Sequence, residues 1–115
     1  MENFHIGAEN RKYPRVPFKR SVKCTIGKDD VQTGEIAQDL SEGGIRIRSN
    51  LFISLGQEVN LSLQLHEAEE IVEVTGRVVW VRYIPHSEIY QVGIEFAQEA
   101  EAPRSRIGRF AGSVL

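Results

Sequence analysis

The chain has 115 residues, of which 41% are hydrophobic and 26% are charged, the composition of an ordinary single globular domain. Its formal net charge is −2, which argues against a general nucleic-acid binder, because such domains are usually basic overall. No apolar run approaches the roughly 20 residues of a membrane span, and the N-terminus has no signal-peptide core. The one cysteine, Cys24, excludes an internal disulfide and a thiolate metal cluster, so we expect a cytoplasmic protein without membrane insertion.

Residues 1–17 are predicted to form a flexible N-terminal arm that carries two arginines four positions apart. Pro14 and Pro17 fix their own φ angles and disfavour helix in the residue before each, so Arg11 and Arg15 should lie on extended backbone. A guanidinium can donate two N–H bonds to a phosphate or to O6 and N7 of guanine. A run of basic residues without an acidic one comprises Arg11, Lys12, Arg15, Lys19, Arg20 and Lys23. The arm is therefore suited to a small anionic ligand.

Residues 18–97 show apolar and polar residues in alternation, the pattern of half-buried strands. The six strands are predicted at residues 18–26, 33–40, 45–48, 59–65, 71–83 and 90–96. Short strands at regular spacing, separated by turns, indicate an all-β fold, a six-stranded antiparallel barrel. The pattern also predicts which side chains point inward. Cys24, Ile36, Leu40 and Tyr90 are expected on inner faces, and Gly76 is expected at a bulge or bend.

Residues 98–115 form a tail of different character. Pro103 stands where a helix could begin, and three apolar residues follow at helical spacing. These residues are Ile107, Phe110 and Val114. We therefore predict a short C-terminal helix that caps the barrel or docks onto a partner.

The segment from Asp39 to Gly44 is a second cluster of polar and small residues. An ionised Asp39 only accepts hydrogen bonds, as the N1–H and N2–H₂ edge of guanine requires, whereas Ser41 can donate to a phosphate or accept from a base. Both side chains point to the same face of an extended segment. Gly43 and Gly44 allow a tight turn with positive φ and a close backbone approach to a ligand. The same residues are ordinary turn chemistry, so this segment alone leaves both interpretations open.

The two motifs together, RxxxR followed by DxSxxG, closely resemble the signature of the PilZ domain, a bacterial receptor for the second messenger cyclic di-GMP. The resemblance covers about residues 9–97 and implies a six-stranded barrel. By resemblance, the ligand-contacting residues are Arg11, Arg15, Asp39, Ser41 and Gly44. A secondary set of contact candidates comprises Asn10, Lys12, Gly43, Arg46, Trp80 and Gly93.

The resemblance implies a cytoplasmic receptor rather than an enzyme, with cyclic di-GMP as ligand and no cofactor. With no effector domain recognised in the sequence, the receptor is expected to change conformation on binding and to signal through a protein partner. The partner and the pathway, whether motility, adhesion or polysaccharide secretion, stay open. Many family members carry a basic residue where this chain has Asn10, so binding of one ligand molecule or of an intercalated dimer also stays open.

The state of the arm without ligand has two interpretations. In the first, its clustered positive charges keep it mobile until phosphates arrive, and the contacts with the ligand then order residues 9–16. In the second, the arm is already packed on the barrel through Tyr13 and Phe4, and the ligand fills a preformed groove.

Two other classes of protein remain as alternatives. A small nucleic-acid-binding β-barrel would need exposed aromatic residues along one sheet face, whereas Phe18, Tyr90 and Phe96 fall on predicted inner faces. A protein-interaction domain that does not bind nucleotide would not need both motifs intact. The three histidines stand far apart in the sequence without the spacing of metal ligands, so no metal site is expected.

Overall fold

The computed structural model describes residues 13–26, 35–65 and 70–114. Three residues of the predicted site, Asn10, Arg11 and Lys12, lie outside this part of the chain, as does most of the predicted arm. Within the described ranges, no helix is both long enough and apolar enough to cross a membrane.

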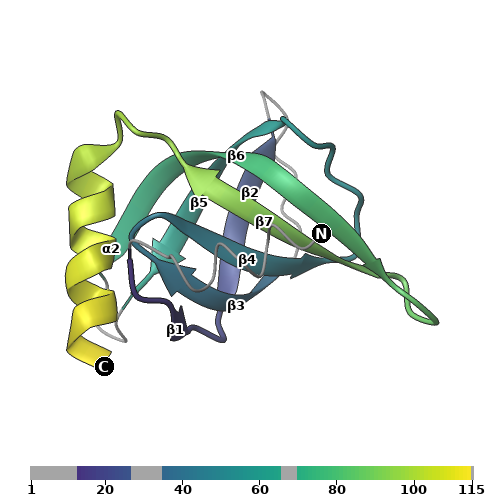
Figure 1. The fold of residues 1–115 in the computed structure, drawn as a ribbon, viewed down its shortest axis with the longest axis horizontal. Coiled ribbons are helices and arrows are strands. Elements are labelled where there is room, and N and C mark those ends of the chain that lie inside the picture. The colour runs from purple at the N-terminus through teal and green to yellow at the C-terminus, as the bar shows by residue number, and fades with distance from the viewer. Residues whose placement is uncertain (1–12, 27–34, 66–69, 115) are drawn as a thin grey trace.

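The described residues contain seven strands and one helix, joined by turns and loops (Figure 1). The strands are β1 (Val16–Pro17), β2 (Ser21–Ile26), β3 (Glu35–Ser41), β4 (Gly44–Ser49), β5 (Glu58–Gln64), β6 (Ile71–Ile84) and β7 (Ile89–Phe96), and the helix is α2 (Glu101–Val114). Neighbouring strands are antiparallel in the order β1-β3-β2-β5-β6-β7-β4, and β3 also pairs with β4. This last pairing closes β2 to β7 into a ring. The predicted barrel of six antiparallel strands is therefore confirmed, with β1 as a short addition to β3.

The inside of the ring is filled by the alternating apolar side chains of the strands. Cys24 points inward as predicted and is 1% exposed, and Leu40 is fully buried. Tyr90 is partly buried and packs against the same core. Because the side-chain period of a strand is two, the residues between these core positions face outward.

Two β-bulges change the alternation on the outer face. The pairing register shifts between Ala37 and Asp39 in β3 and between Val78 and Trp80 in β6. A bulge inserts one extra residue, so the side chains before and after it can both face inward. The prediction that Ile36 points inward is consequently wrong: Ile36 is 47% exposed and Ala37 takes the buried position.

The sequence predicted a bulge or bend at Gly76, but the bulge in β6 lies further along the strand, between Val78 and Trp80. Gly76 keeps regular pairing with Val59 and Phe96. A larger residue would not fit at this position, because a Cβ there would lie 2.6 Å from Cγ2 of Ile94 and 2.8 Å from the carbonyl oxygen of Glu95. The glycine thus permits tight packing between β6 and β7 rather than a bend.

Helix α2 covers one side of the barrel, away from the tip of the β6–β7 hairpin (Figure 1). Its buried residues are Ile107 and Ala111, and the ring of Phe110 meets that of Phe18 edge-on at 5.6 Å between centroids. Pro103 lies in the first turn, where a missing N–H costs no helical bond. The predicted helix is confirmed, although Val114 is 55% exposed and lies outside its packed face.

Candidate ligand-binding site

A groove with a volume of about 770 Å³ lies on the outer face of β3, β4, β7 and β6, beside the residues that lead into β1. Its charged lining residues are Arg15, Lys19, Asp39, Arg46 and Glu95. Its other named features are the turn at Ser41, Gly43 and Gly44 and the side chains of Tyr13, Gln38, Val79 and Trp80. The structure therefore brings all of the predicted site residues that it describes to one groove.

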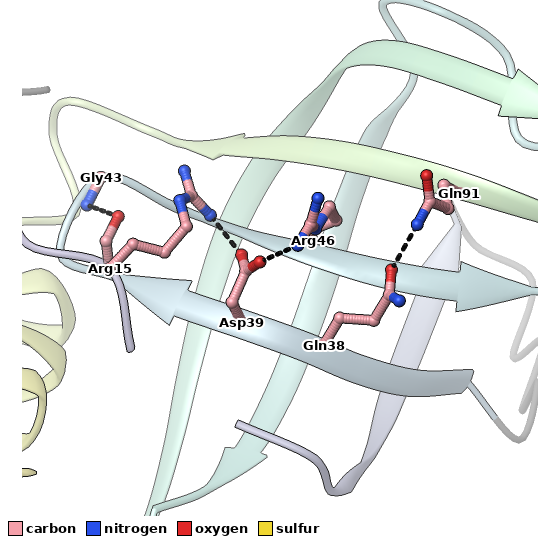
Figure 2. A network of polar contacts seen from close by, with 7 residues as sticks. Arg15, Gln38, Asp39, Gly43, Arg46 and Gln91 are labelled. Atoms are coloured by element: carbon pink, nitrogen blue, oxygen red, sulfur yellow. Dashed lines mark hydrogen bonds and ion pairs between the residues drawn. The ribbon is translucent and has the colours of Figure 1, made fainter. Parts of the chain in front are cut away.

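Asp39 is the centre of the charge arrangement in this groove. Its Oδ1 atom accepts a hydrogen bond from Nη1 of Arg15 at 2.6 Å, and its Oδ2 atom forms an ion pair with Nη2 of Arg46 (Figure 2). The residue is 7% exposed, so it is a buried charge with two cationic partners. A buried carboxylate is tolerated when it is paired and hydrogen-bonded. The bulge after Ala37 turns Asp39 toward the groove and away from the core.

Arg15 reaches Asp39 because the chain just after it is anchored to β3. Val16 is 2% exposed and pairs with Leu40, and Pro17 pairs with Asp39. This short antiparallel pairing fixes the direction from which the Arg15 side chain enters the groove. The C-terminal end of the predicted arm, residues 13–17, therefore lies against the barrel.

The turn between β3 and β4 is held by Ser41. Its Oγ accepts a hydrogen bond from the backbone N–H of Gly43 at 3.2 Å, which leaves the hydroxyl proton for another acceptor. Gly44 lies so close to β7 that a Cβ would clash with the carbonyl oxygen of Ile94. The predicted positive φ at this turn is wrong, because among the described glycines only Gly56 has one, at 81°. Close backbone approach, the other predicted reason for glycine here, is what the geometry shows.

Trp80 and Gly93 form the far side of the groove floor. The two residues are cross-strand partners on β6 and β7, and Gly93 is also the partner of Arg46 on β4. The Trp80 indole lies directly over Gly93, so that a Cβ at position 93 would clash with the ring. One row across four strands thus contains Asp39, Arg46, Gly93 and Trp80.

Several residues that line the groove were not among the predicted site residues. Tyr13, Lys19, Gln38, Val79 and Glu95 line the groove, but none of them is a specified residue of either motif. An aromatic residue between the two arginines was a signal for Tyr13. Val79 faces outward by the regular alternation of β6, whereas Gln38 faces outward because of the bulge in β3, which no local pattern revealed.

A second cavity of about 520 Å³ adjoins the groove where the β3–β4 turn meets helix α2. Tyr13, Gly43 and Glu95 line both cavities. The Tyr13 hydroxyl accepts a hydrogen bond from Nη2 of Arg104 on α2 at 3.2 Å. Among the described residues no group of three or more potential metal ligands occurs.

This combination defines a class of protein: a small closed β-barrel with a cationic groove on its outer face, at the turn between two paired strands. The chain belongs to the PilZ domain family, whose family model matches residues 9–113. No curated protein matches the sequence.

Solved structures share this fold. The inhibitor of motility MotI (DgrA) of Bacillus subtilis superposes with a TM-score of 0.75 at 19% identity, over 90% of this chain and 50% of that one. The PilZ domain of YcgR from Escherichia coli, solved with c-di-GMP, has a TM-score of 0.67 at 13% identity, covering 90% and 89% of the two chains. The MrkH–c-di-GMP complex of K. pneumonia has a TM-score of 0.68 at 20% identity, covering 90% and 52%. This chain therefore spans about half the length of MotI and MrkH.

Proposed function

We propose that the chain is a receptor for cyclic di-GMP, which it binds in the groove over β3, β4, β7 and β6. The observation that carries this proposal is the cluster of Arg15, Asp39 and Arg46, which concentrates positive charge beside the Ser41 turn. Membership of the PilZ family and the c-di-GMP named in the YcgR and MrkH structures support the choice of ligand.

Each motif residue has a chemical role in this proposal. Arg15, with Arg11 outside the described residues, donates to the phosphates or to guanine O6 and N7 and stacks on a base. Asp39 accepts from the guanine N1–H and N2–H₂ edge, and Ser41 donates its hydroxyl proton to a phosphate. The Gly44 backbone allows the turn to approach the ligand closely.

We further propose that ligand binding alters the surface around helix α2 and that a protein partner recognises the change. Tyr13 supports this step, because it stands two residues before Arg15 and bonds Arg104 on α2. The β3–β4 turn also meets the helix, since a Cβ at Gly108 would clash with the Glu42 carboxylate. A ligand that moves Arg15 or the turn would therefore move groups that contact α2. This receptor needs no catalytic step of its own, and we place it in the cytoplasm, where a buried free thiol such as Cys24 stays reduced.

Titration calorimetry of the purified chain tests the ligand. Cyclic di-GMP should bind, whereas GTP and a short single-stranded RNA should not. Replacing Arg15 or Arg11 by Ala should weaken binding by about 1.5–3 kcal/mol, roughly tenfold to more than a hundredfold, as expected for loss of a charged hydrogen-bond donor. Lys23→Ala is the matched control, because Lys23 is an exposed cation on β2 outside the groove.

Binding of the RNA in preference to cyclic di-GMP would favour the nucleic-acid-binding barrel instead. Absence of binding to every nucleotide would favour a protein-interaction domain. Unchanged affinity in both arginine variants, with a wild-type chain that binds, would remove the proposed roles of Arg11 and Arg15 while leaving the ligand in place.

A further inference from the structure

Arg46 adds a second positive charge to a carboxylate that already has a partner. Asp39 uses Oδ1 for Arg15 and Oδ2 for Arg46, so two guanidiniums share one negative charge. The other carboxylate of the groove, Glu95, is exposed on β7 and forms no ion pair with Arg15 or Arg46. Among the described residues, one positive charge of the Asp39 cluster is therefore left without an ion-pair partner of its own.

Arg46 is also held in an unfavourable hydrogen-bonding state. Its Nε atom is buried, and it has no acceptor among the described residues. A buried donor without an acceptor destabilises the folded state, and buried polar groups of this kind are rare in native proteins. Since Arg15 already neutralises Asp39, folding alone gives no reason to keep Arg46 here. Unfavourable arrangements that persist are typical of binding and switch sites.

The position of Arg46 makes its guanidinium available to a ligand. Its backbone lies between Asp39 on β3 and Gly93 on β7, and its side chain is 34% exposed and lines the groove. Nε is buried and Nη2 contacts Asp39, which leaves Nη1 as the donor that nothing else engages among the described residues. Arg15 and Arg46 flank the carboxylate from opposite sides (Figure 2), so the groove presents two separate cationic groups.

We propose that Arg46 is a ligand-binding residue of the groove and that its Nη1 group donates to one phosphate of cyclic di-GMP while Nη2 stays on Asp39. The inference rests on the proposed function and extends it, because Arg46 lies outside the RxxxR motif, whose arginines are Arg11 and Arg15. Asp39 then holds two guanidiniums in fixed positions, one for each of the two phosphates of the ligand. Fixing both groups before the ligand arrives reduces the entropy lost on binding.

The matched control for Arg46 is Arg48. Arg48 is the next outward-facing residue of the same strand, is exposed and does not line the groove. In calorimetry with cyclic di-GMP, Arg46→Ala should weaken binding by about tenfold or more, the effect of losing a charged donor. Arg46→Lys keeps the charge but loses the planar fork, so its affinity should be intermediate. Arg48→Ala should stay within about twofold of wild type. The affinity of Arg46→Ala should also depend less on salt than that of wild type or Arg48→Ala.

The outcomes separate this inference from the proposed function. A folded wild-type chain that does not bind cyclic di-GMP overturns the proposed function, and the role of Arg46 with it. A wild-type chain that binds, together with Arg46→Ala or Arg46→Lys of equal affinity, overturns the role of Arg46 alone. If both variants fail to fold, NMR of the arginine side-chain N–H groups in the wild-type chain decides. Movement of the Arg46 signals during titration supports the inference, and movement of the Arg15 signals alone contradicts it.

Discussion

Tyr13 and Arg104 stand 91 positions apart in the sequence, and the Tyr13 hydroxyl accepts a hydrogen bond from Nη2 of Arg104 at 3.2 Å. The Tyr13 ring also covers the β3–β4 turn, since a Cβ at Gly43 would lie 3.2 Å from its Cδ2 atom. Tyr13 thus contacts the β3–β4 turn on one side and helix α2 on the other. Tyr13 is therefore a direct physical connection between the groove and the helix.

Replacing Tyr13 by Phe should weaken that connection without emptying the space over the turn. The ring stays and only the hydroxyl is lost, so we expect a stability loss of about 0.5–1.5 kcal/mol. Amide hydrogen exchange in α2 should respond to cyclic di-GMP in the wild-type chain and respond less in Tyr13→Phe. Tyr83→Phe is the control, because it removes a hydroxyl that bonds Ser87 in the β6–β7 hairpin. An equal response of α2 in wild type and both variants would exclude Tyr13 as the route.

The two glycines of the turn should differ sharply in their tolerance of alanine. A Cβ at Gly44 would clash with the backbone carbonyl of Ile94, which cannot move without disturbing the β4–β7 pairing. We expect Gly44→Ala to destabilise the fold by about 3 kcal/mol, the upper end for overpacking. Gly43→Ala meets only the edge of the Tyr13 ring and should cost about 1 kcal/mol or less. Thermal unfolding followed by circular dichroism measures both, and equal melting temperatures would contradict the steric explanation.

Gly93→Ala should disturb the groove through Trp80. The new Cβ would occupy the place of the indole, so the ring must turn away from β7. We expect the tryptophan fluorescence spectrum to shift and cyclic di-GMP affinity to fall, with a stability loss of about 1–3 kcal/mol. Since the chain contains one tryptophan, the signal reports this residue alone. An unchanged spectrum together with unchanged affinity would show that the ring does not take part in the site.

Asp39→Ala should reduce both the affinity for cyclic di-GMP and the preference for it over cyclic di-AMP. The carboxylate is the acceptor that we assign to the guanine edge, and an adenine edge carries a different set of donors. The informative quantity is the ratio of the two affinities, measured by calorimetry in wild type and variant. If the variant binds more weakly but keeps the wild-type ratio, Asp39 serves only to position Arg15 and Arg46.

The barrel was predictable because its signal is local. Alternation with a period of two marks each strand wherever one face is buried, and this held for residues such as Cys24 and Leu61. The prediction failed at Ile36, where the bulge beside Asp39 shifts the alternation by one residue. A bulge depends on how two paired strands fit together, so neither strand reveals it alone.

The sequence by itself determined the six barrel strands, the C-terminal helix and the two motifs that place this chain among PilZ domains, because these depend on residues close together in the chain. Only the tertiary structure decided that Arg46 shares Asp39 with Arg15, and that Tyr13 joins the groove to α2. The same holds for Gly44 and Gly93, whose missing side chains make room for β7 and for the Trp80 ring. These relationships arise from strand register and ring closure, which bring distant residues within hydrogen-bonding or van der Waals distance. A pattern that repeats every two residues carries no information about which strands will meet.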